Sequence, residues 1–118
     1  IIFSGGGAAG SFKEFPIYSA TKTAIVRTVE NYSEIFKKNN LSIFAVAPGA
    51  VKTHMLKKVL KLAKVATSSK MHEVTEFINK CLKINTSPFN GKLVHIGDNF
   101  SKIMKNKNMN YLKLRRFQ

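Results

Sequence analysis

The chain has 118 residues, enough for one small domain, and 44% of them are hydrophobic, which excludes a disordered tail. No apolar run approaches the ~20 residues that span a bilayer, and the single cysteine, Cys81, excludes an internal disulfide and is expected in the core. The net charge of +14 comes mainly from lysines spread along the chain, so we expect no specific nucleic-acid partner and no membrane partner.

The first third of the chain predicts a strand, a loop and a long helix. Residues 1–4 form a short apolar run typical of a buried strand, and residues 5–15 form a loop rich in glycine. From 17 to 38 apolar residues recur at the helical period. The predicted buried stripe of this helix consists of Ile25, Val29, Tyr32 and Phe36. Ala20 and Ala24 add a small-residue face suited to close packing.

The remaining pattern alternates strands and helices. Residues 41–47 are an almost unbroken apolar run, as expected of a strand that is covered on both faces. Further elements in chain order are a helix at 53–64, a loop at 67–69, a helix at 71–82, a strand at 92–96 and, from 98 to 118, a short helix with a basic tail. This order predicts an α/β fold, a partial Rossmann-like, doubly wound parallel sheet of three strands with flanking helices. A narrow sheet and a start inside an apolar run suggest part of a larger domain.

The glycines that follow the first strand match the spacing G-x-G-x-x-G from Gly5 to Gly10. In a dinucleotide-binding loop the third glycine opens a helix, and an acidic residue about 20 positions later ends the next strand. Here Gly10 is followed by further loop, and Glu30 falls in the middle of the predicted helix. We therefore interpret the match as coincidental and not as a phosphate loop.

Tyr18 and Lys22 stand four residues apart in the predicted long helix, so both side chains lie on one helix face. A free tyrosine has a pKa near ~10, and a nearby ammonium stabilises the phenolate and lowers that pKa. A tyrosine tuned in this way can exchange a proton with a substrate oxygen while hydride moves elsewhere. An ordinary surface pair is the alternative interpretation.

Polar residues and glycines follow two of the predicted strands. Ser4 ends the first strand, and Pro48 and Gly49 end the second, with Val51 and Thr53 close behind. The carboxyl ends of parallel strands meet at one edge of a sheet, where α/β folds bind ligands. A glycine there lets the backbone approach a ligand closely. The sequence therefore predicts a binding crevice at this edge.

Together these residues resemble the C-terminal half of a short-chain dehydrogenase/reductase. The resemblance covers residues 1–97 and rests on Ser4, Tyr18-Ser19-Ala20-Thr21-Lys22, Pro48-Gly49-Ala50-Val51-Lys52-Thr53 and Gly91-Lys92-Leu93-Val94-His95. It implies that residues 1–118 are the C-terminal portion of a single NAD(P)-binding Rossmann-type domain, with the last three strands of its sheet and a basic tail at 98–118. The complete protein would transfer hydride between an alcohol and a carbonyl, using NAD or NADP. This part, without the cofactor-binding half, would be inactive alone.

The family's roles carry over to the matching positions. Tyr18 would be the general acid/base on the substrate oxygen, Lys22 would lower its pKa and bind the nicotinamide ribose, and Ser4 would orient the substrate. The nicotinamide would be held by Pro48, Gly49, Val51 and Thr53, together with Tyr18 and Lys22. His54 would line the pocket of a small alcohol or carbonyl substrate.

Several points stay open at this level. The family's serine commonly stands 13 residues before the tyrosine, where this chain has Gly5, so the orienting hydroxyl comes from Ser4 or from elsewhere, Ser11 being the other loop hydroxyl. Residues 53–82 would form a substrate lid, whose lysines suit a phosphorylated or nucleotide-linked substrate as well as a solvated helix face. The three histidines lack metal-ligand spacing, so we expect no metal site.

The resemblance implies a homodimer or homotetramer that pairs through helix 17–38, and we expect a cytoplasmic location. Two other functions remain candidates. A non-catalytic α/β binding module, or a degenerate homologue of the family, would have the fold without turnover. A basic nucleic-acid-binding protein would use the densest basic stretch, Lys102 to Arg116, and its binding would weaken steeply with salt.

Overall fold

Three short parallel strands form the centre of the fold. The computed structural model describes residues 1–65 and 68–105. Strands β1 (Ile2–Phe3), β2 (Ala45–Ala47) and β5 (Leu93–His95) pair in the order β1-β2-β5. The predicted α/β fold, a partial Rossmann-like parallel sheet of three strands with flanking helices, is confirmed. Each strand is shorter than its apolar run, because only the residues aligned across neighbouring strands join the ladder.

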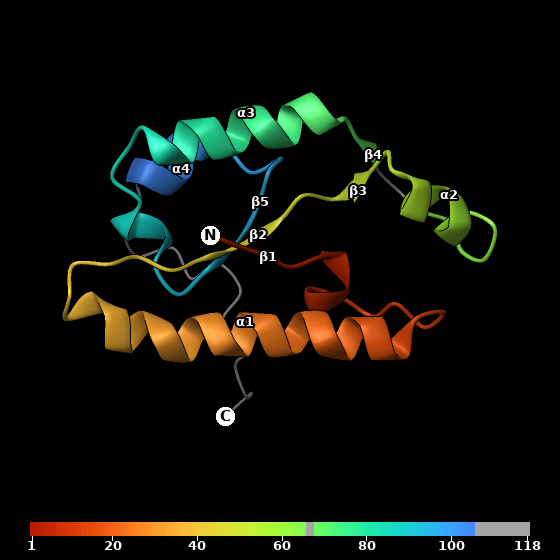
Figure 1. Cartoon of the computed structure of the whole chain (residues 1–118), viewed down its shortest axis with the longest axis horizontal. Helices are drawn as coiled ribbons and strands as arrows, with labels where there is room; N and C mark the ends of the chain where they lie inside the picture. Colours follow the sequence, from red (N-terminus) through yellow and green to blue (C-terminus); the bar gives the residue numbers. More distant parts are fainter. Residues whose placement is uncertain (66–67, 106–118) are drawn as a thin grey trace.

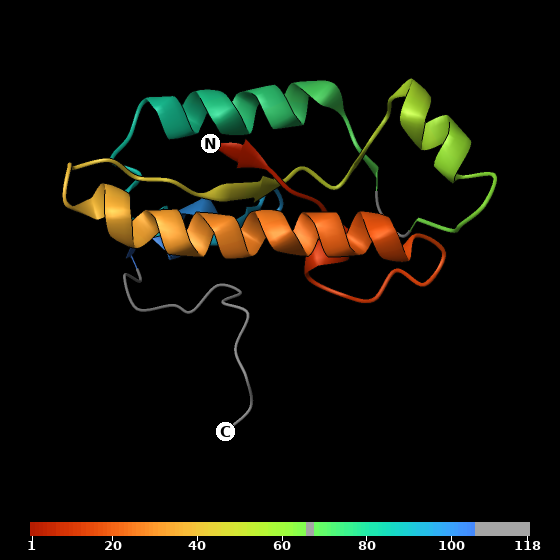
Figure 2. The ribbon, with the colours of Figure 1, turned by 60° about the horizontal axis from the view of Figure 1, so that its bottom comes forward.

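Helices cover both faces of this sheet (Figures 1 and 2). Helix α1 (Pro16–Lys37) covers one face, and α3 (Met71–Leu82) and α4 (Phe100–Lys105) cover the other. Alternate side chains of a strand point to opposite faces, so β2 contributes side chains to two cores, one on each side of the sheet. The core toward α1 contains Ala8, Val26, Val29, Ala45, Ala47 and Leu93. The core toward α3 and α4 contains Phe44, Val46, Phe77, Cys81, Phe89, Val94 and Ile103.

Helix α1 begins and ends within one residue of its predicted range. Pro16 stands at the first helical position, where its missing N–H breaks no helical bond, and Asn40 follows the helix at a left-handed φ of 57°. The predicted stripe is confirmed only at Val29 and is displaced elsewhere, because the residues that α1 buries are Val26, Val29 and Ser33. The small side chains of the sheet let these residues approach it, whereas Tyr32 is 45% exposed and lies against Phe36 with ring centroids 5.4 Å apart.

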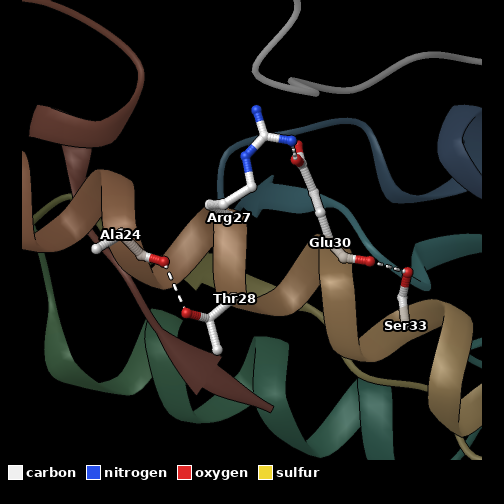
Figure 3. A network of polar contacts seen from close by, with 5 residues as sticks. All are labelled: Ala24, Arg27, Thr28, Glu30 and Ser33. Carbon is white, nitrogen blue, oxygen red and sulfur yellow. Dashed lines mark hydrogen bonds and ion pairs between the residues drawn. The ribbon is translucent and has the colours of Figure 1, made fainter.

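The middle of α1 carries polar contacts of its own (Figure 3). Arg27 Nη1 and Glu30 Oε2 form an ion pair at 2.7 Å. The hydroxyls of Thr28 and Ser33 donate to the carbonyls of Ala24 and Glu30, at 2.9 and 2.7 Å. Glu30 thus lies in mid-helix, as predicted, and not at the end of a strand, where a ribose-binding acid would stand.

The structure contains a second pair of parallel strands that the sequence does not predict. Strand β3 (Ala50–Val51) pairs with β4 (Ser68–Ser69), so the loop predicted at 67–69 is wrong for its last two residues. Two-residue strands show no alternation in a sequence, and their pairing depends on tertiary contact. Helix α2 (His54–Val59) is shorter than the predicted 53–64, and Figure 1 shows it beside β3 and β4 at one end of the molecule.

The predicted basic tail is described only as far as Lys105, within α4. The rest of the stretch from Lys102 to Arg116 lies outside the described residues. In residues 1–65 and 68–105, every helix is too short or too polar to cross a bilayer.

One corner ties α1 to the start of β2 and β5. The Asn90 side chain accepts a hydrogen bond from the Ile43 N–H at 2.9 Å and donates to the Ser33 carbonyl at 3.2 Å. The next residue, Gly91, has φ +71° and donates its N–H to the Ile43 carbonyl at 2.8 Å. A Cβ at Gly91 would stand 2.5 Å from Ser33 Oγ, so only glycine fits this corner.

We expect Asn90→Ala to lower the free energy of unfolding by about 1–3 kcal/mol, because it leaves a partly buried N–H and carbonyl without their partner. Urea denaturation followed by circular dichroism measures the change. Asn85→Ala is the control, because Asn85 accepts one exposed bond from Ser87 N–H and should cost less. Equal losses in the two variants would contradict the role of Asn90.

Cys81 lies in the core between α3 and the sheet, as the sequence predicts, and is 2% exposed. Burial raises the pKa of its thiol above the ordinary value of 9.0. The folded state therefore holds this proton more tightly than the unfolded state. The stabilisation is present below the unfolded pKa and is lost as pH rises through the folded pKa.

We expect Cys81 in the native chain to react with a disulfide reagent at least about 100-fold more slowly at pH 8 than in the urea-unfolded chain, because the thiolate is scarce and covered. The release of the reagent's chromophore gives both rates. Native and unfolded rates within a factor of about two would show that Cys81 is not held in the core.

Candidate active site

The carboxyl ends of the three parallel strands meet at one edge of the sheet. Ser4 and Gly5 follow β1, Pro48 and Gly49 follow β2, and His95 ends β5. Figure 1 shows the N-terminal end of α1 at the same end of the molecule as β3, β4 and α2. The topology therefore gathers the residues predicted from separate stretches at the edge where α/β folds bind ligands.

The first turns of α1 carry Tyr18 and Lys22 at this edge. The Lys22 ammonium lies 5.7 Å from the centroid of the Tyr18 ring and makes a long hydrogen bond, 3.5 Å, to the Phe3 carbonyl. The Tyr18 hydroxyl lies against Gly5, so close that a Cβ on Gly5 would overlap it. Tyr18 is 37% exposed, so a ligand can reach it. The pair is thus anchored beside the end of β1 and open to solvent.

The contacts of Ser4 differ from those that its predicted role in orienting the substrate requires. It is 4% exposed, its N–H donates to the Val46 carbonyl at 2.8 Å, and its hydroxyl donates to the main-chain carbonyl of Lys22 at 3.1 Å. A hydroxyl has one proton to give. In this structure that proton fastens α1 to the end of β1, and only the oxygen of Ser4 remains to accept a bond.

The turn after β2 combines a bare backbone with a helix cap. Gly49 has φ +74°, a left-handed conformation that favours glycine, and Pro48 before it is half-buried. The backbone of Val51 belongs to β3. Thr53 is the N-cap of α2: its side-chain oxygen accepts the Leu56 N–H at 3.3 Å, and it can still donate its own proton.

Two residues join this turn that the sequence analysis does not place there. A Cβ on Gly49 would lie 2.9 Å from Ser69 Oγ and 3.5 Å from His95 Nε2. His95 Nδ1 accepts the Gly97 N–H at 3.0 Å, so a neutral ring carries its proton on Nε2, facing Gly49. No sequence pattern finds them, because their position depends on the pairing of β3 with β4 and of β2 with β5.

Other predicted residues stand apart from this cluster. His54 is the exposed first residue of α2, and Ser11 is exposed in the loop before α1. In the described part of the chain, no three His, Cys, Asp or Glu side chains come together in a way that could hold a metal ion. A hollow between α3 and the segment after β5 contains none of the predicted site residues; its lining includes Glu73, Glu76, Phe77, Lys80, Asp98 and Phe100.

A parallel sheet whose carboxyl edge carries a tyrosine–lysine pair and a glycine turn defines an α/β protein of the Rossmann-like, doubly wound class. Residues 1–64 match the family model described as short chain dehydrogenase, and this range includes the segments from Tyr18 to Lys22 and from Pro48 to Thr53. The chain belongs to the short-chain dehydrogenase family. No curated protein and no solved structure gives a significant match.

Ser19, next to Tyr18, has a buried hydroxyl oxygen that finds no hydrogen-bond partner among the described residues. It packs against Gly7, where a Cβ would stand 2.8 Å from the oxygen. Ser4 and Ser19 therefore form a matched pair at one site: one hydroxyl makes a buried hydrogen bond, and the other is buried without one.

We expect Ser4→Ala to lower the free energy of unfolding by about 0.5–1.5 kcal/mol, because α1 loses its bond to the end of β1. Ser19→Ala should leave it unchanged or raise it, because an unsatisfied oxygen is removed. Urea denaturation of both variants gives the two values. A larger loss for Ser19→Ala than for Ser4→Ala would contradict these hydrogen-bond assignments.

Proposed function

We propose that this protein is an NAD(P)-dependent oxidoreductase that transfers hydride between an alcohol and a carbonyl compound. The observation that carries the proposal is the Tyr18–Lys22 pair at the carboxyl edge of the sheet, with the Tyr18 ring partly exposed and the Lys22 ammonium 5.7 Å from its centroid. Membership of the short-chain dehydrogenase family supports the reaction class.

In this proposal Tyr18 holds and moves the proton at the substrate oxygen. The phenol donates its proton to a carbonyl oxygen in reduction and takes it back from a hydroxyl in oxidation. The Lys22 ammonium stabilises the negative charge that develops on the phenol oxygen. The position of Lys22 is fixed by α1, and the hydrogen bond from the Ser4 hydroxyl holds α1 against the end of β1.

The residues after β2 fit the nicotinamide end of NAD or NADP. Gly49 has a left-handed φ that favours glycine, and a Cβ there would crowd Ser69, so the turn keeps a bare backbone that a ligand can approach. When bound, the dinucleotide supplies the hydride acceptor or donor. The residues proposed to hold it are Pro48, Gly49, Val51 and Thr53 around the nicotinamide, with Lys22 on the ribose and Tyr18 beside it.

For the substrate we propose a small alcohol or carbonyl compound whose oxygen meets Tyr18. His54, exposed at the start of α2, would contact the far side of the substrate. The prediction that Ser4 orients the substrate oxygen stays a prediction: the oxygen of Ser4 can accept a hydrogen bond, while its hydroxyl donates to the main-chain carbonyl of Lys22. We also propose that residues 1–118 form the C-terminal portion of the Rossmann-type domain, because the glycines after β1 lead into a short 3-10 turn at Gly6–Ala8 and not into a long helix.

We further propose that α1 pairs subunits in a homodimer or homotetramer. Apolar residues stand on the outer face of α1 without cover from the described chain: Ile17 is 77% exposed and Ile35 56% exposed. Ala20 and Ala24 are exposed as well, and their small side chains would allow a second helix to approach closely.

We expect Tyr18→Phe to lower kcat/KM by about 10²–10⁴-fold, because the ring stays and the proton carrier is lost. The change is measured as steady-state turnover, followed by the absorbance of the reduced nicotinamide. The measurement uses the native protein, by which we mean the complete chain of which residues 1–118 are proposed to be the C-terminal portion. Tyr32→Phe is the matched control, because Tyr32 lies on the outer side of the same helix and should leave turnover unchanged.

Binding separates this proposal from a non-catalytic α/β module. The Tyr18→Phe variant should keep the cofactor affinity of the native protein, whereas the 118-residue chain alone should not bind reduced nicotinamide dinucleotide at submillimolar concentration. Full turnover by Tyr18→Phe would overturn the assignment of Tyr18. A native protein that binds the dinucleotide and turns over no alcohol or carbonyl substrate would favour the binding module.

A further inference from the structure

Gly5 stands where β1 meets the tyrosine–lysine pair. It is buried and follows directly on Ser4, which is tied to β2 and to α1 by two hydrogen bonds. An ideal Cβ on Gly5 would overlap the Tyr18 hydroxyl oxygen and would lie 3.3 Å from Tyr18 Cζ and 3.6 Å from Lys22 Cγ. The place that a Cβ of Gly5 would take is therefore beside both the phenol and the lysine stem.

The backbone does not explain why this position is a glycine. Gly5 has φ −167° and ψ 169°, an extended conformation that any residue adopts. Gly49 and Gly91 differ from it, because their positive φ favours glycine whatever surrounds them. What a side chain at position 5 would disturb is the contact with Tyr18 and Lys22.

We propose that Gly5 is a positioning residue for Tyr18: because Gly5 has no side chain, the phenol hydroxyl can lie at the carboxyl end of β1, where a Cβ would otherwise stand. The proposal rests on the proposed function, in which that hydroxyl carries the proton. The proposal also distinguishes the directions in which Ser4 and Gly5 face. Ser4 is turned to the main chain of Lys22, and Gly5 is the residue of this strand end that meets the Tyr18 oxygen.

A larger residue at position 5 should displace Tyr18 and leave the fold in place. The overlapping atom is the far end of a side chain that is 37% exposed, so the ring can move outward at small expense to the core. The hydroxyl then leaves the place that α1 and β1 give it. A misplacement of about 1 Å is enough to slow a reaction about 100-fold.

The next residue, Gly6, offers a matched control. No atom lies within 4 Å of the place that a Cβ on Gly6 would take, and Gly6 has no positive φ. Gly5→Ala and Gly6→Ala therefore add the same methyl group to the same loop, one against Tyr18 and one into open space.

The direct test is the position of the Tyr18 ring in a chain labelled with ¹³C-tyrosine. The sequence has three tyrosines, so the resonance that disappears in Tyr18→Phe identifies Tyr18. We expect a nuclear Overhauser effect between the Tyr18 ring and the α protons of Gly5 in the native chain. Gly5→Ala should shift the Tyr18 resonance and remove the short contact, and Gly6→Ala should change neither. A Tyr18 resonance that is insensitive to Gly5→Ala, or equally sensitive to both variants, would overturn the proposal.

Turnover in the native protein gives the second readout. Gly5→Ala should lower kcat by about 10–100-fold with little change in the KM of the dinucleotide, and it should lower kcat no further when Tyr18 is already phenylalanine. A loss of the same size in Gly6→Ala would refute the positioning role. If the resonance of Tyr18 responds as expected and no variant or native protein turns over substrate, Gly5 still positions Tyr18 and the proposed function alone fails.

Discussion

Parallel pairing of β1, β2 and β5 is the constraint on which the rest of this structure depends. Parallel strands cannot be joined by a tight turn, so each connection must return along the length of the sheet. Helix α1 makes the first return, and the segment that contains α2 and α3 makes the second. As a consequence, the strand ends and the start of α1 all meet at one edge, and residues far apart in the sequence become neighbours there.

The same pairing gives the sheet two unequal cores. Toward α1 the sheet presents Ala45 and Ala47, so this helix lies close enough for the Ser4 hydroxyl to reach the Lys22 carbonyl. Toward α3 and α4 it presents Phe44 and Val46, and aromatic rings fill a wider space. The small side chains therefore let α1 lie close to the sheet, while the bulky ones fill the wider space toward α3 and α4.

The end of β1 shows how a shift of one residue changes chemistry. Neighbouring residues of an extended segment point to opposite sides, so Ser4 and Gly5 cannot both face the Tyr18 hydroxyl. The resemblance to the family implies Ser4 in that place, with Ser11 as the other candidate hydroxyl. In the structure, the hydrogen bond from Ser4 to the main chain of α1 turns Ser4 away, and the bare Gly5 receives the phenol. Residue type alone does not decide which of two neighbours faces a site.

The sequence by itself determined the elements with a clear local cause. Helix α3 occupies the predicted 71–82, since its apolar residues recur at the helical period, and the apolar run before Pro48 contains β2. It also placed Tyr18 and Lys22 on one helix face. Only the tertiary structure decided the face of α1 that is buried, the β3–β4 pair, and the meeting of Gly49 with Ser69 and His95. These features depend on contacts between distant segments, whose distances and directions are set by packing against the sheet and leave no periodic trace in the chain.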